Sequence, residues 1–202
     1  MVNDLTGKLS LNEMLRIFIP GIYFATMTDI TITPLLPLKF FVSMQESLYT
    51  VLFIVFSLIG GLLISSLDMP KKLWYFKNAL PINQLKTEIG SIPQVTKEVA
   101  YFKFYDREIS KEFKIKTELD SGYYHLCTNI AIIALFFLLI CLFLYRDFNE
   151  YVSLNILFII LSTLSAWSLF KNKVLKNFNR QKKQFENSEE FTNLRINLEN
   201  NN

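Results

Sequence analysis

Residues 124–170 read YHLCTNIAIIALFFLLICLFLY (124–145), RDFNE (146–150) and YVSLNILFIILSTLSAWSLF (151–170), and this stretch decides the fold. Neither apolar run contains an acidic residue, a lysine, an arginine, a glycine or a proline. A helix rises about 1.5 Å per residue and a bilayer core is about 30 Å thick, so each run is long enough to span it. Because a spanning backbone must satisfy its own hydrogen bonds, we predict two transmembrane helices joined as an antiparallel hairpin.

Two further apolar segments precede this hairpin. Residues 48–67 form an uninterrupted run that predicts another span. Residues 17–38 are less regular, because Pro20 can kink a helix near the start of the segment. We expect a helix that ends near Thr31 and an extended exit over residues 32–46. The apolar residues, 51% of the chain, are thus concentrated in blocks, which predicts an all-α integral membrane protein with four transmembrane helices.

These spans divide the chain into four expected parts. They are 1–67 (N-terminal segment and first two spans), 68–122 (a small cytoplasmic insert), 123–170 (the transmembrane hairpin) and 171–202 (a basic amphipathic stem and disordered tail). Within the insert, residues 96–107 fit a helix or a strand. The alternation in KEFKIK, residues 111–116, favours a short strand.

The stem continues the last span. Its apolar positions keep helical spacing and predict one stripe along a helix that extends beyond the membrane: Trp167, Phe170, Val174, Phe178 and Phe185. From about Glu186 onward the chain is rich in Asn and Glu, and we expect a disordered tail there.

The distribution of cationic residues predicts the orientation. Ten Lys and Arg residues lie in 68–122 and seven follow residue 170, whereas the two remaining links hold one each. Because cationic loops stay in the cytoplasm, both termini and the insert should be cytoplasmic. Heavy use of Ile, Phe, Asn and Lys is typical of an AT-rich bacterial genome, so we expect the bacterial inner membrane.

Small residues in the second segment predict a helix-packing face. They are spaced so that most of them share one side of the helix and allow another helix to approach closely: Ser57, Gly60, Gly61 and Ser65. The partner helix belongs either to the same bundle or to another subunit. We expect a homo-oligomer that uses faces of this kind.

Polar residues within the spans are candidates for packing or transport. Asp29 lies either at the outer interface, among threonines, or in the membrane with an ion or proton role. Asn129 and Asn155 usually join helices by hydrogen bonds, and the alternative is a pore lining.

Basic residues next to the spans are candidates for contact with a cytoplasmic partner protein or with lipid headgroups. They are Lys71, Lys72, Lys173, Lys176, Arg180, Lys182 and Lys183, with Trp74 beside them. Phe178 and Phe185 are interleaved with the stem cations, as in nucleic-acid binding, but a basic stem beside a membrane needs no such explanation. The bilayer and a protein partner are therefore favoured over nucleic acid.

The chain shows no motif that names an enzyme, a cofactor or a metal site. His125 is the one histidine, and we expect it in the interfacial belt. It lies two positions from Cys127, so the two side chains point away from each other on a helix. Cys127 and Cys141 are too far apart along one helix to form a disulfide. We expect no catalytic, cofactor-binding or metal-ligating residues.

The layout resembles the small four-span membrane components of bacterial anti-phage defence systems, such as the Kiwa membrane protein. The resemblance is architectural: IPGIYF in the first span, SLIGGLLISSLD at the end of the second, an aromatic-rich insert and a basic stem. It implies a membrane-bound sensor or effector that works with a cytoplasmic partner.

We therefore expect a non-enzymatic, self-associating protein that couples the membrane to a cytoplasmic partner or signal. One alternative is an oligomeric pore that depolarises the membrane when triggered. The weakest alternative is a membrane-embedded enzyme that modifies lipid.

Overall fold

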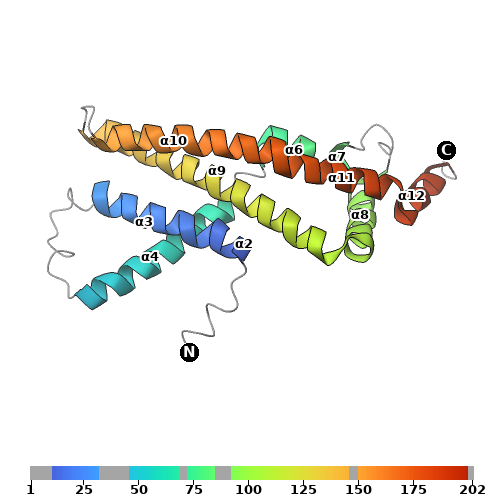
Figure 1. The fold of residues 1–202 in the computed structure, drawn as a ribbon, viewed down its shortest axis with the longest axis horizontal. Helices are drawn as coiled ribbons and strands as arrows, with labels where there is room; N and C mark the ends of the chain where they lie inside the picture. The colour runs from blue at the N-terminus through green and yellow to red at the C-terminus, as the bar shows by residue number, and fades with distance from the viewer. Residues whose placement is uncertain (1–10, 32–45, 69–71, 85–91, 146–149, 200–202) are drawn as a thin grey trace. The chain divides into compact units, whose positions relative to one another are not determined.

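The computed structural model describes residues 11–31, 46–68, 72–84, 92–145 and 150–199, and every regular element in these ranges is helical (Figure 1). The elements are α2 (Leu11–Glu13), η1 (Met14–Phe18), α3 (Ile19–Thr31), α4 (Glu46–Leu67), α6 (Trp74–Ala79), α7 (Pro81–Gln84), α8 (Gln94–Glu108), α9 (Lys111–Tyr145), α10 (Glu150–Leu169), η3 (Phe170–Val174), α11 (Leu175–Glu186) and α12 (Glu189–Glu199). The two η elements are π-helical turns. The predicted all-α class is confirmed.

Three of these helices are long and apolar enough to cross a membrane. They are Leu48–Leu67, Lys111–Phe143 and the continuous helix Glu150–Glu186. Each presents large apolar side chains on the surface; Leu63, Phe143 and Leu164 are all more than half exposed. An apolar surface of this extent fits contact with lipid. These helices are compatible with a multi-pass membrane protein.

The chain folds as two units. An apolar unit comprises residues 1–70 and 121–169, and a polar unit comprises residues 71–120 and 170–202. The insert and the stem therefore share one unit. Both unit boundaries next to the hairpin lie within continuous helices. Helix α9 contributes residues to both units, and so does the helix formed by α10, η3 and α11.

The first segment is helical to Thr31, where the sequence predicted its end. Its π turn ends at Phe18, two residues before Pro20, and the Ile19 N–H donates to the Met14 carbonyl five residues back. Proline has no N–H and its ring crowds the carbonyl four residues earlier, so a wider turn accommodates it. The expected extended exit falls mostly on residues 32–45, which lie outside the described part of the chain.

The helix formed by η1 and α3 packs against each of the other three apolar helices. Met27 is buried in a cluster with Ile133 and Phe137 of α9. The Phe24 ring lies 5.7 Å from the Phe137 ring. The Tyr23 ring lies 5.0 Å from that of Phe158 on α10.

The contacts of this helix with α4 have an antiparallel register. Near one end, the Arg16 guanidinium lies 3.9 Å from the Asp68 carboxylate, just after α4. At the other end, the Tyr49 hydroxyl donates to the Asp29 carboxylate at 2.7 Å. Gly21 meets the backbone of Ser57 between these two levels. The first helix therefore follows α4 along most of its length.

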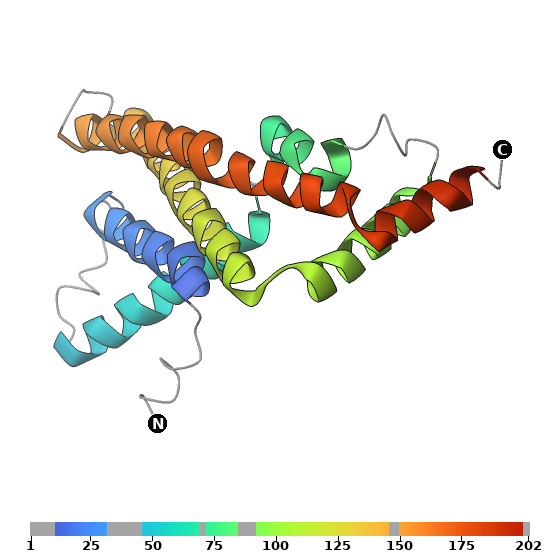
Figure 2. The ribbon, with the colours of Figure 1, turned by 45° about the vertical axis from the view of Figure 1, so that its right-hand side comes forward.

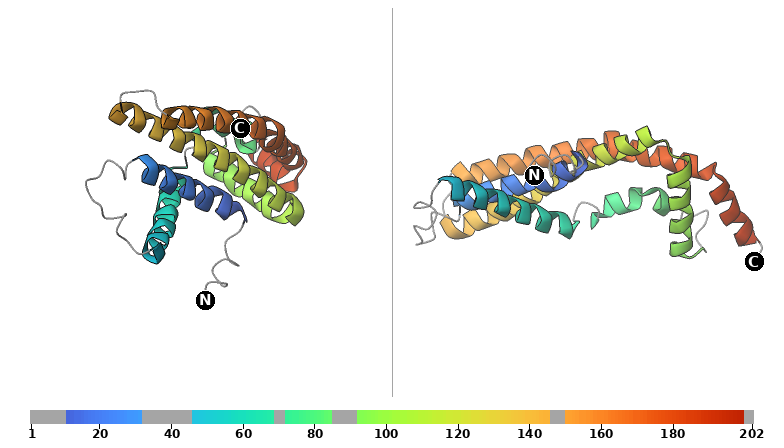
Figure 3. Two further views of the ribbon diagram at one scale, coloured as in Figure 1. Left: turned by 60° about the vertical axis from the view of Figure 1, so that its left-hand side comes forward. Right: turned by 90° about the horizontal axis from the view of Figure 1, so that it is seen from below.

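An aromatic core organises the polar unit. The Phe185 ring of α11 packs against Tyr101 and Phe104 of α8 and against Phe191 of α12, with ring centres 5.2–5.5 Å apart. Figures 2 and 3 show α12 lying beside α8. Ile109, Phe113 and Leu194 complete the same buried cluster.

Two expectations for this unit are wrong. The expected strand at 111–116 forms the first turns of α9, where the Ser110 hydroxyl accepts a hydrogen bond from the Phe113 N–H as a helix cap. The expected disordered tail is helix α12 from Glu189 to Glu199. Ser188 caps this helix in the same way, through the Phe191 N–H. The ambiguous residues 96–107 are helical.

The stem prediction holds for four of its five apolar positions. Phe170, Val174, Phe178 and Phe185 are buried within the polar unit. Trp167 is 54% exposed and belongs to the apolar unit. Tryptophan combines an apolar ring with a polar N–H, and such a side chain suits a membrane–water interface.

Candidate functional site on the basic face of helix α11

Helix α11 is amphipathic, and its buried face fixes it in the polar unit. Asn177, Phe178, Gln181 and Phe185 are buried at helical spacing. Burial of two amide side chains is costly unless they are hydrogen-bonded. The Gln181 carbonyl oxygen accepts a bond from the Tyr101 hydroxyl at 2.7 Å, and the Asn177 amide donates to Asp120 at 2.9 Å.

Rings also hold the helix in place. Phe178 meets the Phe76 ring of α6 with centres 5.5 Å apart, and Phe76 also lies 6.1 Å from Phe170. Burial raises the pKa of Tyr101, so its hydroxyl stays protonated and able to donate to Gln181. The buried face of α11 therefore gives its exposed face a defined position.

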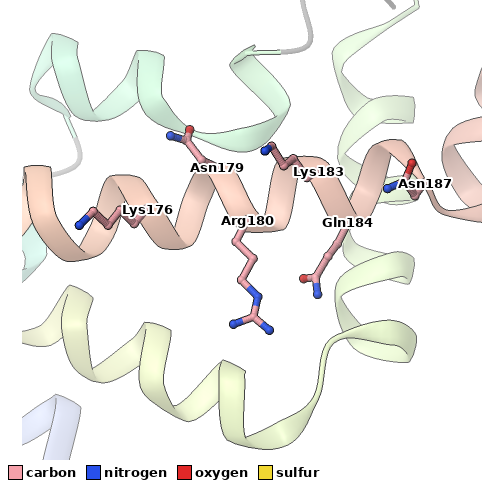
Figure 4. A pocket seen from close by; sticks show the side chains of 6 residues that line it. All are labelled: Lys176, Asn179, Arg180, Lys183, Gln184 and Asn187. Carbon is pink, nitrogen blue, oxygen red and sulfur yellow. The ribbon is translucent and has the colours of Figure 1, made fainter.

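The exposed face of α11 carries a hollow of about 470 Å³. Figure 4 shows the side chains around it leaving one helix, with Arg180 and Gln184 on one side and Asn179 on the other. The lining consists of three cations and three amides: Lys176, Asn179, Arg180, Lys183, Gln184 and Asn187.

Arg180 is the best-oriented cation of this face. Its guanidinium carbon lies 4.6 Å from the centre of the Phe113 ring, which belongs to α9. Stacking on an aromatic ring restricts the side chain while leaving its hydrogen-bond donors available. Phe113 is itself buried, so the contact links Arg180 to the core of the polar unit.

The three cations at the hollow, Lys176, Arg180 and Lys183, form no ion pair with another described residue. Lys182, on the flank, pairs with Glu186 at 3.3 Å. Three cations and three amide groups on one anchored face can bind carboxylates or phosphates.

The other predicted contact residues do not join this hollow. Lys72 and Lys173 are exposed elsewhere, and Lys182 is half-buried at its ion pair. Lys71 and the side chain of Trp74 lie outside the described part of the structure. The amides Asn179, Gln184 and Asn187 were not predicted. Their spacing relative to the cations is the signal that could have identified them.

The polar residues of the predicted spans form hydrogen bonds with neighbouring groups. Asp29 accepts from Tyr49 at the end of α4 that is remote from Asp68. The Asn155 amide donates to the Tyr151 carbonyl at 2.8 Å, and its oxygen lies 3.5 Å from the Tyr23 hydroxyl.

Asn129 contacts the backbone of the first helix. Its amide nitrogen lies 3.4 Å from the Arg16 carbonyl, the group four residues before Pro20 that the missing proline N–H leaves available. This contact joins α9 to the kinked part of the first segment. Asn129 is buried, and its side-chain oxygen has no hydrogen-bond partner among the described residues.

The small residues of α4 face the first helix of the same chain. A Cβ atom on Gly61 would overlap the Ile17 carbonyl, and one on Gly21 would overlap the Ser57 carbonyl. Gly60 faces the Phe24 ring, and Ser65 is half-buried. The first helix of the same chain therefore covers this face.

His125 is enclosed within the apolar unit rather than exposed on its surface. It is 2% exposed, and the neighbouring Tyr124 is fully buried. Cys127 and Cys141 are free thiols. The described residues contain no group of three or more His, Cys, Asp or Glu side chains that could hold a metal ion.

Comparison with known proteins adds no relative. No protein family, curated protein or solved structure matches the chain. The geometry of the two units therefore carries the functional argument.

Proposed function

We propose that this protein is a non-enzymatic, self-associating protein of the bacterial inner membrane that binds an acidic cytoplasmic partner through the basic face of α11. It has four transmembrane helices, and both termini are cytoplasmic. The partner bears carboxylate or phosphate groups, and the protein holds that partner at the membrane and couples the two.

The observation that carries this proposal is the hollow on α11. Lys176, Arg180 and Lys183 surround it, and the Tyr101–Gln181 bond and the ring contacts anchor their helix. Cations that only set the orientation of a membrane protein need nothing but charge, whereas the helix that carries these cations is anchored in the polar unit. Rigid presentation lowers the entropic cost of binding a specific partner.

Lipid headgroups are a less favoured ligand for this face. Arg180 follows Leu169, the last residue of α10, by eleven positions, which is about 16 Å along a helix. Electrostatic attraction is screened over about 8 Å at physiological ionic strength. Headgroup contact therefore suits Lys171 and Lys173 better than the cations of the hollow.

The fourth span rests on the register of the first helix. The helical residues 11–31 extend about 30 Å, enough to cross a bilayer core. They pack antiparallel to α4 from the Arg16–Asp68 level to the Asp29–Tyr49 level. If α4 crosses the membrane, its neighbour lies at the same depths. Asp29 is then at the outer interface rather than in the bilayer core.

The cation distribution supports the cytoplasmic placement of the polar unit, which contains most of the Lys and Arg residues. The architectural resemblance to anti-phage defence components supports a sensor or effector role in such a system. The pore alternative draws less support, because Asn155 and Asp29 are bonded to neighbouring side chains and backbone.

Charge reversal tests the proposal. The variant Lys176→Glu, Arg180→Glu, Lys183→Glu is purified in mild detergent with its bound cytoplasmic proteins. The matched control reverses three exposed cations of the same unit, in Lys111→Glu, Lys116→Glu, Arg195→Glu.

We expect the first variant to retain less than about a tenth of the bound partner, because one lost charge-assisted contact costs about 1.5 kcal/mol or more. The control should retain most of the partner. Equal retention by both variants, or equal loss from both, would contradict a role for the α11 face.

A further inference from the structure

The side chains around the α11 hollow leave the helix in different directions, so its cations do not converge on one point. In Figure 4, Arg180 and Gln184 extend to one side of α11, whereas Asn179 and Lys183 extend to the other. Lys176 precedes Arg180 by about one helical turn. Each side of the hollow therefore offers one cation and one amide.

The two sides differ in how firmly their cation is held. The guanidinium of Arg180 rests on the ring of Phe113, which is part of the buried aromatic core. A guanidinium that stacks on a ring keeps its plane fixed and presents its N–H edge to a ligand. Lys183 lies over no ring in the described part of the chain. Its ammonium is a point charge on a flexible stem, which attracts anions without selecting their shape.

Gln184 adds hydrogen-bond donors next to the oriented guanidinium. It follows Arg180 by four residues, a spacing that makes the two side chains neighbours on one helix face. Both side chains are exposed. A carboxylate can accept two parallel bonds from one guanidinium and still has lone pairs for another donor. Arg180 and Gln184 together therefore match the acceptors of one carboxylate.

A phosphate group fits this arrangement less well. A phosphate monoester carries a charge of about −1.5 to −2 at pH 7 and three acceptor oxygens, so converging cations match it best. At the hollow, Arg180 and Lys183 extend to opposite sides of the helix. One cation with one neutral amide instead suits an anion of a single charge.

We propose that Arg180 and Gln184 form a carboxylate-binding fork, and that an aspartate or glutamate side chain in an acidic segment of the protein partner occupies it. This inference rests on the proposed function and names the chemical group that the basic face of α11 selects. Charge complementarity supports this occupant, because Arg180 forms no ion pair with another described residue. Phe113 is the positioning residue of the fork.

The test compares two anions on the full chain in mild non-ionic detergent, by titration calorimetry. One probe is a hexaglutamate peptide blocked at both ends, and the other is a linear inorganic polyphosphate of equal charge. Arg180→Lys keeps the charge of the fork but removes its planar edge, and Lys183→Gln removes a charge from the opposite side of α11. Lys116→Gln, at an exposed cation elsewhere in the polar unit, is the control.

We expect Arg180→Lys to weaken hexaglutamate binding about 10-fold, because the paired charge-assisted bonds are lost. The loss from Lys183→Gln should be about threefold, as for an exposed charge, and Lys116→Gln should change nothing. Polyphosphate binding should fall less with Arg180→Lys than with Lys183→Gln, because it responds to charge alone.

Phe113 supplies a second readout. Phe113→Tyr keeps a ring under the guanidinium and should retain hexaglutamate binding, whereas Phe113→Leu should weaken it. The loss from Phe113→Leu should nearly vanish in the Arg180→Lys background, because the ring acts through Arg180. A loss of equal size in both backgrounds would show a merely structural effect and contradict the positioning role. Far-UV circular dichroism checks that each variant keeps its helical content.

Three results would overturn the fork. If Arg180→Lys weakens hexaglutamate no more than Lys183→Gln does, charge alone governs binding. If Arg180→Lys weakens polyphosphate as much as it weakens hexaglutamate, the side chain does not select carboxylates. If neither probe binds the unmodified chain, the face has no affinity for these anions. The proposed function is judged separately, by loss of the bound partner from the triple charge reversal.

Discussion

The contact between the first helix and α4 makes a sharp prediction from two neighbouring glycines. Gly60 and Gly61 are adjacent on α4, but their surroundings differ. A Cβ atom on Gly61 would overlap the backbone carbonyl of Ile17. A Cβ atom on Gly60 would lie 2.5 Å from an atom of the Phe24 ring, which can rotate. Alanine should therefore be tolerated at one position and not at the other.

The expected size of the difference follows from these contacts. Alanine raises intrinsic helix propensity about equally at both positions, so this effect cancels in the comparison. Overpacking against atoms that cannot move typically costs about 1–3 kcal/mol. We expect Gly61→Ala to lower the free energy of unfolding by about 2 kcal/mol more than Gly60→Ala does.

The assay is equilibrium unfolding in mixed micelles by titration with a denaturing detergent, followed by far-UV circular dichroism. Gly21→Ala is a third variant, because its Cβ atom would overlap the Ser57 carbonyl in the same contact. Both Gly21→Ala and Gly61→Ala force the same two helices apart. The double variant should therefore cost less than the sum of the single variants.

The reasoning is refuted if Gly61→Ala is as stable as Gly60→Ala or more so. Strict additivity of Gly21→Ala and Gly61→Ala would also count against a shared contact. A change in native mass without a change in unfolding would return Gly61 to an interface between subunits.

Three further predictions concern the polar unit. Tyr101→Phe should cost about 1–3 kcal/mol, because the buried Gln181 oxygen loses its donor; adding Gln181→Leu should recover part of this in chemical denaturation. Ser188→Ala should cost about 1 kcal/mol and speed amide exchange in the first turn of α12, which it caps. The pKa of the Glu108 carboxyl is raised in the folded state, so the folded state loses stability as pH rises through that pKa. In thermal unfolding, Glu108→Gln should therefore be more stable than the unmodified protein at pH 7 but not below pH 4.

The sequence predicted features that follow from local periodicity. The helical hairpin segments follow from the length of their apolar runs, and the helix end at Thr31 follows from the prolines after it. The buried stripe from Phe170 to Phe185 follows from the spacing of apolar residues along one helix. The connecting residues 146–149 lie outside the described ranges. Each of these features can be read from residues close together in the sequence, without knowing which distant segment packs against them.

Features that depend on a distant partner could not be predicted in this way. The alternation at 111–116 looked like a strand, but Ile115 is exposed, and the cap at Ser110 starts a helix that continues into α9. The small face at Gly61 was visible, but its partner, Ile17, was not. His125 is buried because other segments cover it, which its own neighbours in sequence do not reveal.

The tail was mispredicted from its composition. Residues after 186 are rich in Asn and Glu, which favours disorder. Ser188 before two glutamates is a typical helix start, and Phe191 and Leu194 are spaced to face one side. Both are buried in the aromatic core. Burial of these two side chains can stabilise a short helix of average polarity, and composition alone does not reveal this contribution.

The central claim is a four-span protein whose polar unit faces the cytoplasm, and the side of the membrane on which residue 8 lies tests it most directly. In the proposed topology, the two segments of the polar unit flank the α9–α10 hairpin and share one side of the membrane. Residue 39 then lies on the other side, because α4 separates it from the polar unit. The location of residue 8 shows whether the first helix also crosses.

The measurement uses single cysteines at positions 8, 39 and 187 in a Cys127→Ala, Cys141→Ala background, labelled with a membrane-impermeant maleimide. In intact spheroplasts the account predicts labelling at position 39 alone, with positions 8 and 187 labelled only after permeabilisation. Labelling of position 8 together with position 39 would leave three spans and contradict the account. Labelling of position 187 in intact spheroplasts would place the basic face of α11 outside the cell.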